Sequence, residues 1–383
     1  MTHLVVVGAS VGGVNTAKQL REHDFDGKIT LLSAENQTPY DRPPLTKSYL
    51  QADDAEMFEL QPLDWYRKAE VCLRMDSAAA ALDLGRRCIT TASGETISFD
   101  TLVIATGTRP RTIEVPGLGP LPTVSTLKEA QHLREQLSTA QHVVIVGAGF
   151  VALEIAAVAS SRGLPVTVLA PTRTSVLRSL DRETADRLIG VHEARGVRFA
   201  WEQSILGGEQ TSEGLVIRLS DGETVEGAVV VAAIGCTPNT SWITGIAVDP
   251  LRGLACDPWG QTSVEGVYAV GDVTEPYVPR LGRRVVNRHW TNAVNQANAA
   301  AARIIGIDHA GVDALPYYWS DQAELNLRYV GDLSTTAVLH EDTNERGRVA
   351  VYGVNGIVTG VVSINRPADL IRYQRRIGNT LTA

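Results

Sequence analysis

Cysteine is scarce in this sequence. The 383-residue chain contains only four, which are Cys72, Cys88, Cys236 and Cys256. No two of them form a C-x-x-C or C-x-x-x-x-C pair, and this spacing excludes a local zinc knuckle and a local redox disulfide. We therefore expect four reduced thiols, partly buried in cores, and no metal site.

Long apolar runs are also lacking, and none approaches the ~20 residues that a membrane-spanning helix needs. The first residues, Met1-Thr2-His3, lead directly into an apolar strand, without the basic region, apolar core and small-residue cleavage site of a signal peptide. We therefore expect a cytoplasmic protein with no membrane association.

An excess of positive charge is the third absence. The formal net charge is −8, which argues against general nucleic-acid binding. With 44% hydrophobic and 20% charged residues, the composition is that of an ordinary globular protein. The length favours two or three domains, and it leaves both a monomer and a homodimer open.

A β-turn-α-β pattern occurs twice in the chain. The first copy has an apolar run over 4–7, a glycine-rich turn, a helical stretch to about His23 and a second apolar run over 29–32. The second copy has the same parts, with a run over 143–146, a turn, a helix over 150–161 and a strand over 166–169. This long period predicts duplicated domains and not a solenoid.

Shorter β-patterned segments surround the two copies. Those over 80–83, 88–91 and 95–98 are typical of a small meander with a turn at Ser93-Gly94. Further strands are expected over 102–105, 229–234 and 267–270, and the Pro- and Gly-rich stretch 110–122 is expected to cross between domains. After about Ile307, β patterns over 325–330 and 349–364 indicate a separate small α+β domain.

The first glycine-rich turn has Gly8, Ser10 and Gly13 at the positions of a G-x-G-x-x-G pattern, with Gly12 beside them. Such a turn allows close approach of a pyrophosphate, which then faces the positive end of the following helix. Serine at the middle position is a small departure from the pattern. Glu35 lies about 22 residues beyond Gly13, where an acid binds an adenosine ribose.

The second turn has Gly147, Gly149 and Ala152 at the same positions. Its second strand ends at Ala170, where an acid would select NAD, and Arg173 and Arg178 follow. An unopposed arginine there can bind a 2′-phosphate, which favours NADPH. Arg173 as a solvated loop charge, in an enzyme that accepts NADH as well, is the alternative.

The segment Pro39–Lys47 (PYDRPPLTK) is more specific than either turn. It resembles a stretch of the FAD-dependent ferredoxin reductases, which include the putidaredoxin, rubredoxin and biphenyl-dioxygenase ferredoxin reductases. Further matches follow in the same order, at 105–107 (ATG), 268–273 (YAVGDV), 288–293 (RHWTNA), 316–322 (PYYWSDQ) and 365–367 (NRP). The resemblance covers essentially the whole chain.

The resemblance implies an α/β fold with two Rossmann-like dinucleotide-binding domains, in a glutathione-reductase-like architecture, plus a small C-terminal α+β domain. We expect an FAD-binding domain over 1–112 and 238–306, an NAD(P)H-binding domain over 113–237 and the C-terminal domain over 307–383.

The family pattern implies roles for further residues. Lys47, Glu154 and Trp319 are the catalytic candidates, with Lys47 and Glu154 expected as a pair beside flavin and nicotinamide. Trp319 would shield the flavin or lie on the electron exit route. The helix beginning near His289-Trp290 would direct its N-terminus at the flavin. The remaining cofactor-binding candidates are Arg42, Ala105, Thr106, Gly107, Arg109, Gly235, Gly271 and Asp272.

The resemblance implies that NADH or NADPH reduces FAD, and that electrons then pass singly to a [2Fe–2S] ferredoxin serving a cytochrome P450 or a dioxygenase. Without a cysteine pair, electrons must leave the flavin directly. A basic rim would steer an acidic ferredoxin, with candidates Arg280, Arg283, Arg284, Arg288, Arg372, Arg375 and Arg376. The alternatives are an NAD(P)H oxidase or other direct reductase, and a redox-regulated binding protein resembling apoptosis-inducing factor.

Overall fold

The computed structural model describes residues 2–52, 58–173, 180–211, 214–313, 315–333 and 337–381. The chain forms two compact units. The first comprises Met1–Asp41, Met57–Arg109 and Cys236–Pro316, and the second comprises Arg42–Glu56, Pro110–Gly235 and Tyr317–Ala383. Each unit contains one copy of the β-turn-α-β pattern. No helix among the described residues is long and apolar enough to cross a membrane.

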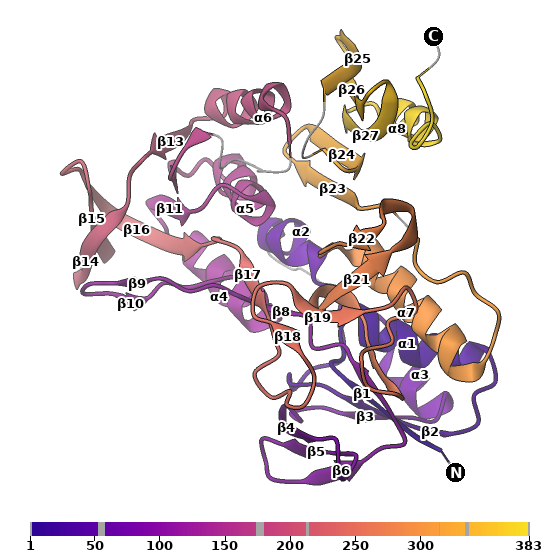
Figure 1. The fold of residues 1–383 in the computed structure, drawn as a ribbon. Helices are drawn as coiled ribbons and strands as arrows, with labels where there is room; N and C mark the ends of the chain where they lie inside the picture. Colours follow the sequence, from indigo (N-terminus) through magenta and orange to yellow (C-terminus); the bar gives the residue numbers. More distant parts are fainter. Residues whose placement is uncertain are drawn as a thin grey trace. The chain divides into compact units, whose positions relative to one another are not determined.

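A parallel five-stranded sheet forms the centre of the first unit, in the order β20-β7-β1-β2-β3. Figure 1 labels β1, β2 and β3 of this sheet. The strands are β1 (His3–Val7), β2 (Lys28–Leu32), β3 (Val71–Arg74), β7 (Thr101–Ile104) and β20 (Val267–Ala269). Residues 4–7 are all buried, as expected of a strand that is covered on both faces.

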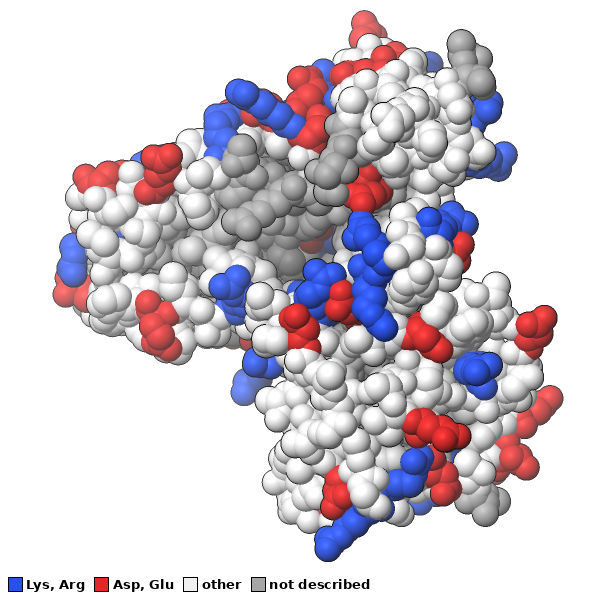
Figure 2. Space-filling view, in the orientation of Figure 1, with Lys and Arg blue, Asp and Glu red and all other residues white. Residues whose placement is uncertain are grey.

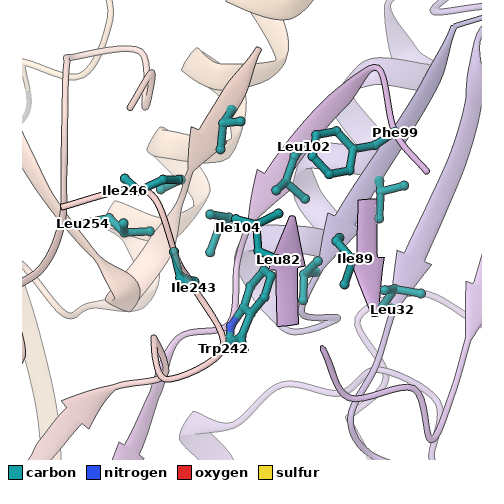
Figure 3. Packing of buried hydrophobic residues seen from close by; sticks show 14 of the residues in the cluster. Leu32, Leu82, Ile89, Phe99, Leu102, Ile104, Trp242, Ile243, Ile246 and Leu254 are labelled. Atoms are coloured by element: carbon teal, nitrogen blue, oxygen red, sulfur yellow. The ribbon is translucent and has the colours of Figure 1, made fainter. Parts of the chain in front are cut away.

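Two helices cover one face of this sheet, and they are α1 (Val11–Glu22) and α7 (Trp290–Ile305). The other face packs on the predicted meander, formed by β4 (Ala79–Asp83), β5 (Cys88–Thr91) and β6 (Thr96–Ser98). Figure 3 shows Leu82 and Ile89 of the meander beside Leu102, Ile104 and the segment carrying Trp242. The sheet thus holds its glycine turn on a core that is packed from both sides.

Shorter elements complete the first unit. They are α3 (Leu63–Lys68), the 3₁₀ turns η3 (Gly271–Val273) and η4 (Pro279–Leu281), and a four-stranded sheet of β18 (Val248–Asp249), β19 (Gly253–Cys256), β21 (Thr274–Val278) and β22 (Arg283–Arg284). A short ribbon pairs β8 (Thr108–Pro110) with β17 (Cys236–Pro238).

The second unit has a six-stranded sheet in the order β13-β12-β11-β16-β15-β14. The strands β11 (His142–Val146), β12 (Val166–Ala170), β13 (Val197–Trp201) and β16 (Thr224–Ala232) run parallel. The last two, β15 (Gly214–Leu219) and β14 (Ile205–Thr211), are antiparallel. The helices are α4 (Leu127–Leu137), α5 (Phe150–Ser161) and α6 (Arg182–Ala194), and a hairpin joins β9 (Glu114–Val115) to β10 (Gly119–Pro120).

The C-terminal segment forms a five-stranded antiparallel sheet in the order β23-β24-β27-β26-β25. Its elements are β23 (Tyr317–Gln322), β24 (Leu325–Gly331), β25 (Ala337–Asn344), β26 (Gly347–Val354), β27 (Ile357–Ile364) and α8 (Pro367–Gln374). The predicted fold class, two dinucleotide-binding folds and a C-terminal α+β segment, is confirmed.

The division into units differs from the expected domain boundaries in several places, one of which is that residues 307–316, expected in the C-terminal domain, belong to the first unit. The segment 42–56, with η1 (Pro43–Thr46) and α2 (Ser48–Gln51), joins the second unit although it lies within the range 1–112. The Arg134 guanidinium lies 4.5 Å from the Tyr49 ring, and Arg162 donates to the Leu50 carbonyl at 2.5 Å.

The C-terminal sheet belongs to the same unit because Tyr318 stacks on Phe150 of α5 at 6.5 Å. The three-domain assignment stays a prediction.

Candidate functional site

The first glycine turn connects β1 to α1. Gly8 has φ +109°, and a Cβ added there would lie 2.2 Å from the Ala105 carbonyl oxygen. A Cβ on Gly13 would lie 1.9 Å from the Gly8 carbonyl oxygen. Both positions therefore exclude a side chain, and the backbone at this turn stays open to a ligand.

The N-terminus of α1 has neither a side-chain cap nor an acidic residue in its first turn, within the described segment. Ser10 is its N-cap residue in extended conformation, and in this described segment its hydroxyl does not cap the helix. The first turn carries no acidic side chain among the described residues. The free N–H groups and the positive helix end are thus available to a phosphate.

Glu35 lies three residues beyond Leu32, the last residue of β2. It is partly exposed, and the Tyr40 hydroxyl donates to its Oε2 at 2.6 Å. The Ser33 hydroxyl donates to the Glu35 carbonyl oxygen at 3.1 Å. Tyr40 comes from the segment that carries the family resemblance, so this segment orients the acid after the first turn.

Two hydrogen bonds join the Asp272 segment to α7 and to the residues before it. The Gly271 N–H donates to Gln296 Oε1 of α7 at 2.6 Å, and Arg288 Nε donates to the Asp272 carbonyl oxygen at 3.3 Å. The helix α7 begins at Trp290, with His289 as its N-cap residue. Its predicted start near His289-Trp290 is confirmed.

The indole N–H of Trp290 makes a hydrogen bond that holds this side chain in place. Trp290 Nε1 donates to Asp41 Oδ1 at 2.8 Å, which joins the start of α7 to the end of the first part of the unit. Trp290 is therefore held by a polar contact as well as by packing.

The stretch Ala105-Thr106-Gly107 follows β7 and is held by Asn239. Thr106 Oγ1 donates to the Asn239 carbonyl oxygen at 2.8 Å, and Asn239 Nδ2 donates to the Thr106 carbonyl oxygen at 3.0 Å. Arg109 donates to the Pro238 carbonyl oxygen at 3.1 Å. These contacts position the carboxyl end of β7 next to Gly8, where the ligands of parallel sheets bind.

The second glycine turn repeats the geometry of the first. Gly147 has φ +113°, and a Cβ there would lie 2.3 Å from the Ala233 carbonyl oxygen. Gly149 is the N-cap residue of α5, with open space at its Cβ position, and Ala152 is fully buried. Gly235, another candidate, has φ +96° and accepts from the Arg111 N–H at 2.9 Å.

The edge beyond the second turn differs from the first. Ala170 is the last residue of β12 and is 1% exposed, so this strand ends on a buried methyl group, whereas Glu35 lies three residues beyond the end of β2. The Gly8 N–H donates to the Leu32 carbonyl oxygen and the Gly147 N–H to that of Leu169, so Ala170 corresponds to Ser33 and not to Glu35. Arg173 is half exposed, lies 3.3 Å from Asp186 Oδ1, and its guanidinium is 5.4 Å from the Trp201 ring centre. Trp201 pairs in register with Ala170. Arg178 lies outside the described residues.

Lys47 and Glu154 form the predicted pair. Glu154 lies on α5, just past Ala152, and is 5% exposed. Lys47 Nζ lies 2.9 Å from Glu154 Oε1. The Thr46 hydroxyl donates to Glu154 Oε2 at 2.6 Å, and the Ser320 hydroxyl donates to Oε1 at 2.6 Å. A nearly buried carboxylate therefore has three donors, which offset the loss of water.

Trp319 lies on the other face of β23 from Ser320, because successive residues of a strand alternate. Its ring centre is 6.2 Å from that of Tyr317. Within the second unit, Trp319 is thus directed away from the face that carries the contact to Glu154. Its expected place beside the flavin stays a prediction.

The arginines of the expected basic rim are not equivalent. Arg288 is partly buried and donates to the carbonyl oxygens of Leu251 and Cys236 as well as Asp272, so it fastens loops of the first unit together. Arg284 donates to the Cys256 carbonyl oxygen at 2.6 Å, and Arg280 pairs with Asp313 at 3.0 Å. Arg372, Arg375 and Arg376 are exposed on and after α8. Figure 2 shows acidic and basic side chains interspersed on the visible face.

All four cysteines are free thiols. Burial raises the pKa of the Cys256 thiol to about 12, so it stays protonated and unreactive. Among the described residues, no cluster of histidine, cysteine and acidic side chains could hold a metal ion.

The two copies of the β-turn-α-β pattern also share a histidine–threonine contact that was not expected from the sequence. His3 at the start of β1 bonds Thr30 of β2 through Nε2 at 2.9 Å, and His142 at the start of β11 bonds Thr167 of β12 at 2.9 Å. Burial lowers the pKa of both imidazoles. The equal spacing of each histidine from its glycine turn was visible in the sequence.

Comparison with known proteins covers nearly the whole chain. Residues 2–297 match the family described as pyridine nucleotide-disulphide oxidoreductase, and residues 317–382 match the family described as reductase C-terminal. The ferredoxin–NAD(+) reductase component of the anthranilate 1,2-dioxygenase system of Burkholderia cepacia is 32% identical, over 97% of this chain and 93% of that protein.

Two solved structures have the same fold at a TM-score of 0.92. The ferredoxin reductase for the CYP199A2 system of Rhodopseudomonas palustris is 29% identical and covers 100% of this chain and 96% of its own. The putidaredoxin reductase of a covalent complex with putidaredoxin is 26% identical and covers 99% of this chain and 94% of its own.

Proposed function

The chain belongs to the pyridine nucleotide-disulphide oxidoreductase family, and from this premise we propose that it is an FAD-dependent NAD(P)H:ferredoxin oxidoreductase. The observation that carries the proposal is the duplicated glycine turn. At each turn a glycine approaches a backbone carbonyl too closely for any side chain, and a helix begins directly after it. Two such turns match a flavin dinucleotide and a nicotinamide dinucleotide.

The residues of the first unit fit FAD. Gly8 and Gly13 leave backbone open at the pyrophosphate position, and Glu35 is oriented by Tyr40 for a ribose. The N-terminus of α7 supplies further N–H groups and a helix dipole that favour negative charge. When bound, FAD supplies the change from two-electron to one-electron chemistry that a ferredoxin requires. We assign this role to 1–112 and 238–306, of which 42–56 belongs to the second compact unit.

The residues of the second unit fit the nicotinamide coenzyme. Gly147 and Gly149 open the pyrophosphate position at the start of α5, and Glu154 follows on the same helix. Since Lys47 is paired with Glu154 at 2.9 Å, the pair is fixed close to the coenzyme turn. We assign it the orientation of the nicotinamide ring for hydride transfer, without a proton transfer of its own.

The coenzyme preference follows from the edge beyond the second turn. A ribose with a free 2′-hydroxyl gains no carboxylate partner at Ala170, whereas a 2′-phosphate would gain Arg173. We therefore propose a preference for NADPH over NADH. Asp186 limits that preference, because it competes with the phosphate for the Arg173 guanidinium.

The electron acceptor is proposed to be a [2Fe–2S] ferredoxin that serves a cytochrome P450 or a ring-hydroxylating dioxygenase. The relatives are named as reductase components of such systems, and one solved structure is a complex with putidaredoxin. The cysteine pair of a disulfide reductase is lacking in the sequence. The exposed Arg372, Arg375 and Arg376 are the best candidates for steering an acidic carrier, because Arg284 and Arg288 bind backbone carbonyls.

The experiment is ferredoxin reduction measured optically with NADPH as donor, at low and high salt. We expect reduction that depends on both proteins and weakens with salt, because exposed charges are screened. Oxygen consumption that is equally fast without a ferredoxin would contradict the proposed acceptor.

A further inference from the structure

A buried hydrogen-bond chain leads from Glu154 into the C-terminal sheet. Ser320 Oγ donates to Glu154 Oε1 at 2.6 Å, Gln322 Nε2 donates to Ser320 Oγ at 3.0 Å, and His192 Nε2 lies 3.0 Å from Gln322 Oε1. All four side chains are at most 5% exposed. They come from α5, β23 and α6, so the chain of bonds joins three elements of the second unit.

The direction of every proton in this chain follows from donor chemistry. A carboxylate only accepts, so the single Ser320 proton points at Glu154. The Ser320 oxygen then accepts from the Gln322 amide nitrogen, which leaves the Gln322 oxygen to accept from His192. His192 is therefore protonated at Nε2, and burial lowers its pKa, so the imidazole stays neutral.

We propose that Ser320, oriented by Gln322, is a positioning residue for the Lys47–Glu154 pair. Thr46 and Lys47 are neighbours in one short segment, and alone they would leave the Glu154 carboxylate held from one side. Ser320 holds the same Oε1 that Lys47 binds, from a strand 166 residues away in the sequence. The C-terminal sheet thereby completes the coenzyme-side pair. This inference rests on the proposed function of that pair.

The first readout is independent of the reaction. In FAD-loaded enzyme without coenzyme, acylation of Lys47 by an amine-reactive reagent is quantified by peptide mass spectrometry. We expect Ser320→Ala to raise the Lys47 labelling rate several-fold, because Glu154 then holds the ammonium group less firmly, and Glu154→Gln to raise it further. Labelling as slow as in the wild type would overturn the proposal.

The second readout is flavin reduction by NADPH in anaerobic stopped flow. Ser320→Ala should lower the limiting rate on the order of tenfold, the loss expected for one hydrogen bond to a charged group, and leave coenzyme affinity within about twofold. Ser320→Thr should restore most of the rate, and Gln322→Met should have a smaller effect. Equal losses in Ser320→Ala and Ser320→Thr would overturn the proposal.

The matched control is Ser363→Ala. Ser363 lies on β27 of the same sheet, is fully buried, and among the described residues its hydroxyl has no hydrogen-bond partner. The Ser363→Ala variant should leave the Lys47 labelling rate and the flavin reduction rate unchanged.

The variants Glu154→Gln and Lys47→Met separate the proposed role of the Lys47–Glu154 pair from the proposed positioning role of Ser320. If both variants reduce flavin at the wild-type rate, the proposed role of the pair fails. If they are slow while Ser320→Ala behaves like Ser363→Ala, only the positioning role fails.

Discussion

A side chain on Gly8 would meet the Ala105 carbonyl oxygen at 2.2 Å, and one on Gly147 would meet the Ala233 carbonyl oxygen at 2.3 Å. The two turns also share a histidine–threonine contact between their first two strands. They differ at the end of the second strand, because β2 is followed by Glu35 whereas β12 ends at the buried Ala170. We propose that the common part of the duplication binds a pyrophosphate, and that the part that differs sets which nucleotide is accepted.

The largest expected effects come from the glycines themselves. Gly8→Ala should destabilise the first unit by about 3 kcal/mol or more, because it combines a positive φ with a backbone clash, and FAD should be lost on purification. Gly147→Ala should keep FAD and lose reduction by either coenzyme. The flavin-to-protein absorbance ratio and coenzyme titration measure these outcomes.

The controls are Gly94→Ala and Gly163→Ala, which have φ +88° and +76° with nothing within 4 Å of an added Cβ. They share the backbone conformation without the clash, so both should retain FAD and coenzyme binding. Loss of FAD in Gly147→Ala would show that the two turns do not have separate roles.

Substitutions of Glu35 and Ala170 test the difference between the two turns. Glu35→Gln should weaken FAD binding about tenfold, since a hydrogen bond to a charged group contributes about 1.5–3 kcal/mol. Ala170→Asp should move the preference from NADPH toward NADH by a similar factor. The ratio of kcat/KM for the two coenzymes measures this change, and an unaltered ratio in Ala170→Asp would contradict the account.

Arg173 and Asp186 should have smaller effects, because both are about half exposed. Arg173→Ala should raise KM for NADPH several-fold and leave KM for NADH nearly unchanged. Asp186→Asn should lower KM for NADPH about twofold by releasing Arg173. If Arg173→Ala weakens both coenzymes equally, Arg173 does not read the 2′-phosphate.

The smallest effect concerns pH. Burial lowers the pKa of His3 and His142, so the unfolded chain binds more protons than the folded one as pH falls below about 6.5. Stability should therefore decline from pH 7.5 to 5.5, and less steeply in His3→Gln and His142→Gln. Thermal unfolding should show a difference of about 1–3 °C at the lower pH. If the stability of a variant declines with falling pH as steeply as that of the wild type, the replaced histidine is not a source of the pH dependence.

Much of the fold was predictable where the pattern is local. The helix over 150–161 and the turn at Ser93-Gly94 are as expected, since Gly94 has φ +88° and closes on Thr91. The segment 349–364 was read as β-patterned, and it is a hairpin that turns at Asn355-Gly356, both with positive φ. That dipeptide is itself a strong hairpin signal.

Helix α4 was not expected, although Thr126 and Glu129 form a capping box that the sequence shows.

The site was predictable only in part, for a physical reason. Lys47 and Glu154 came from the family resemblance, because no periodicity connects residues so far apart. The donors Thr46 and Ser320 bond Glu154, and Gln322 bonds Ser320 in turn. Hydroxyl and amide side chains have no local sequence signature of that role. The contacts of Tyr49 with Arg134 and of Leu50 with Arg162 are long-range in the same way.

The most direct test of the two unequal turns is anaerobic stopped-flow reduction of the purified flavoprotein by NADPH and NADH separately. We predict that the flavin absorbance bleaches with both coenzymes, with a larger second-order rate constant for NADPH. Bleaching by neither coenzyme would contradict the assignment of the second turn, and a clear advantage for NADH would contradict the role given to Ala170 and Arg173.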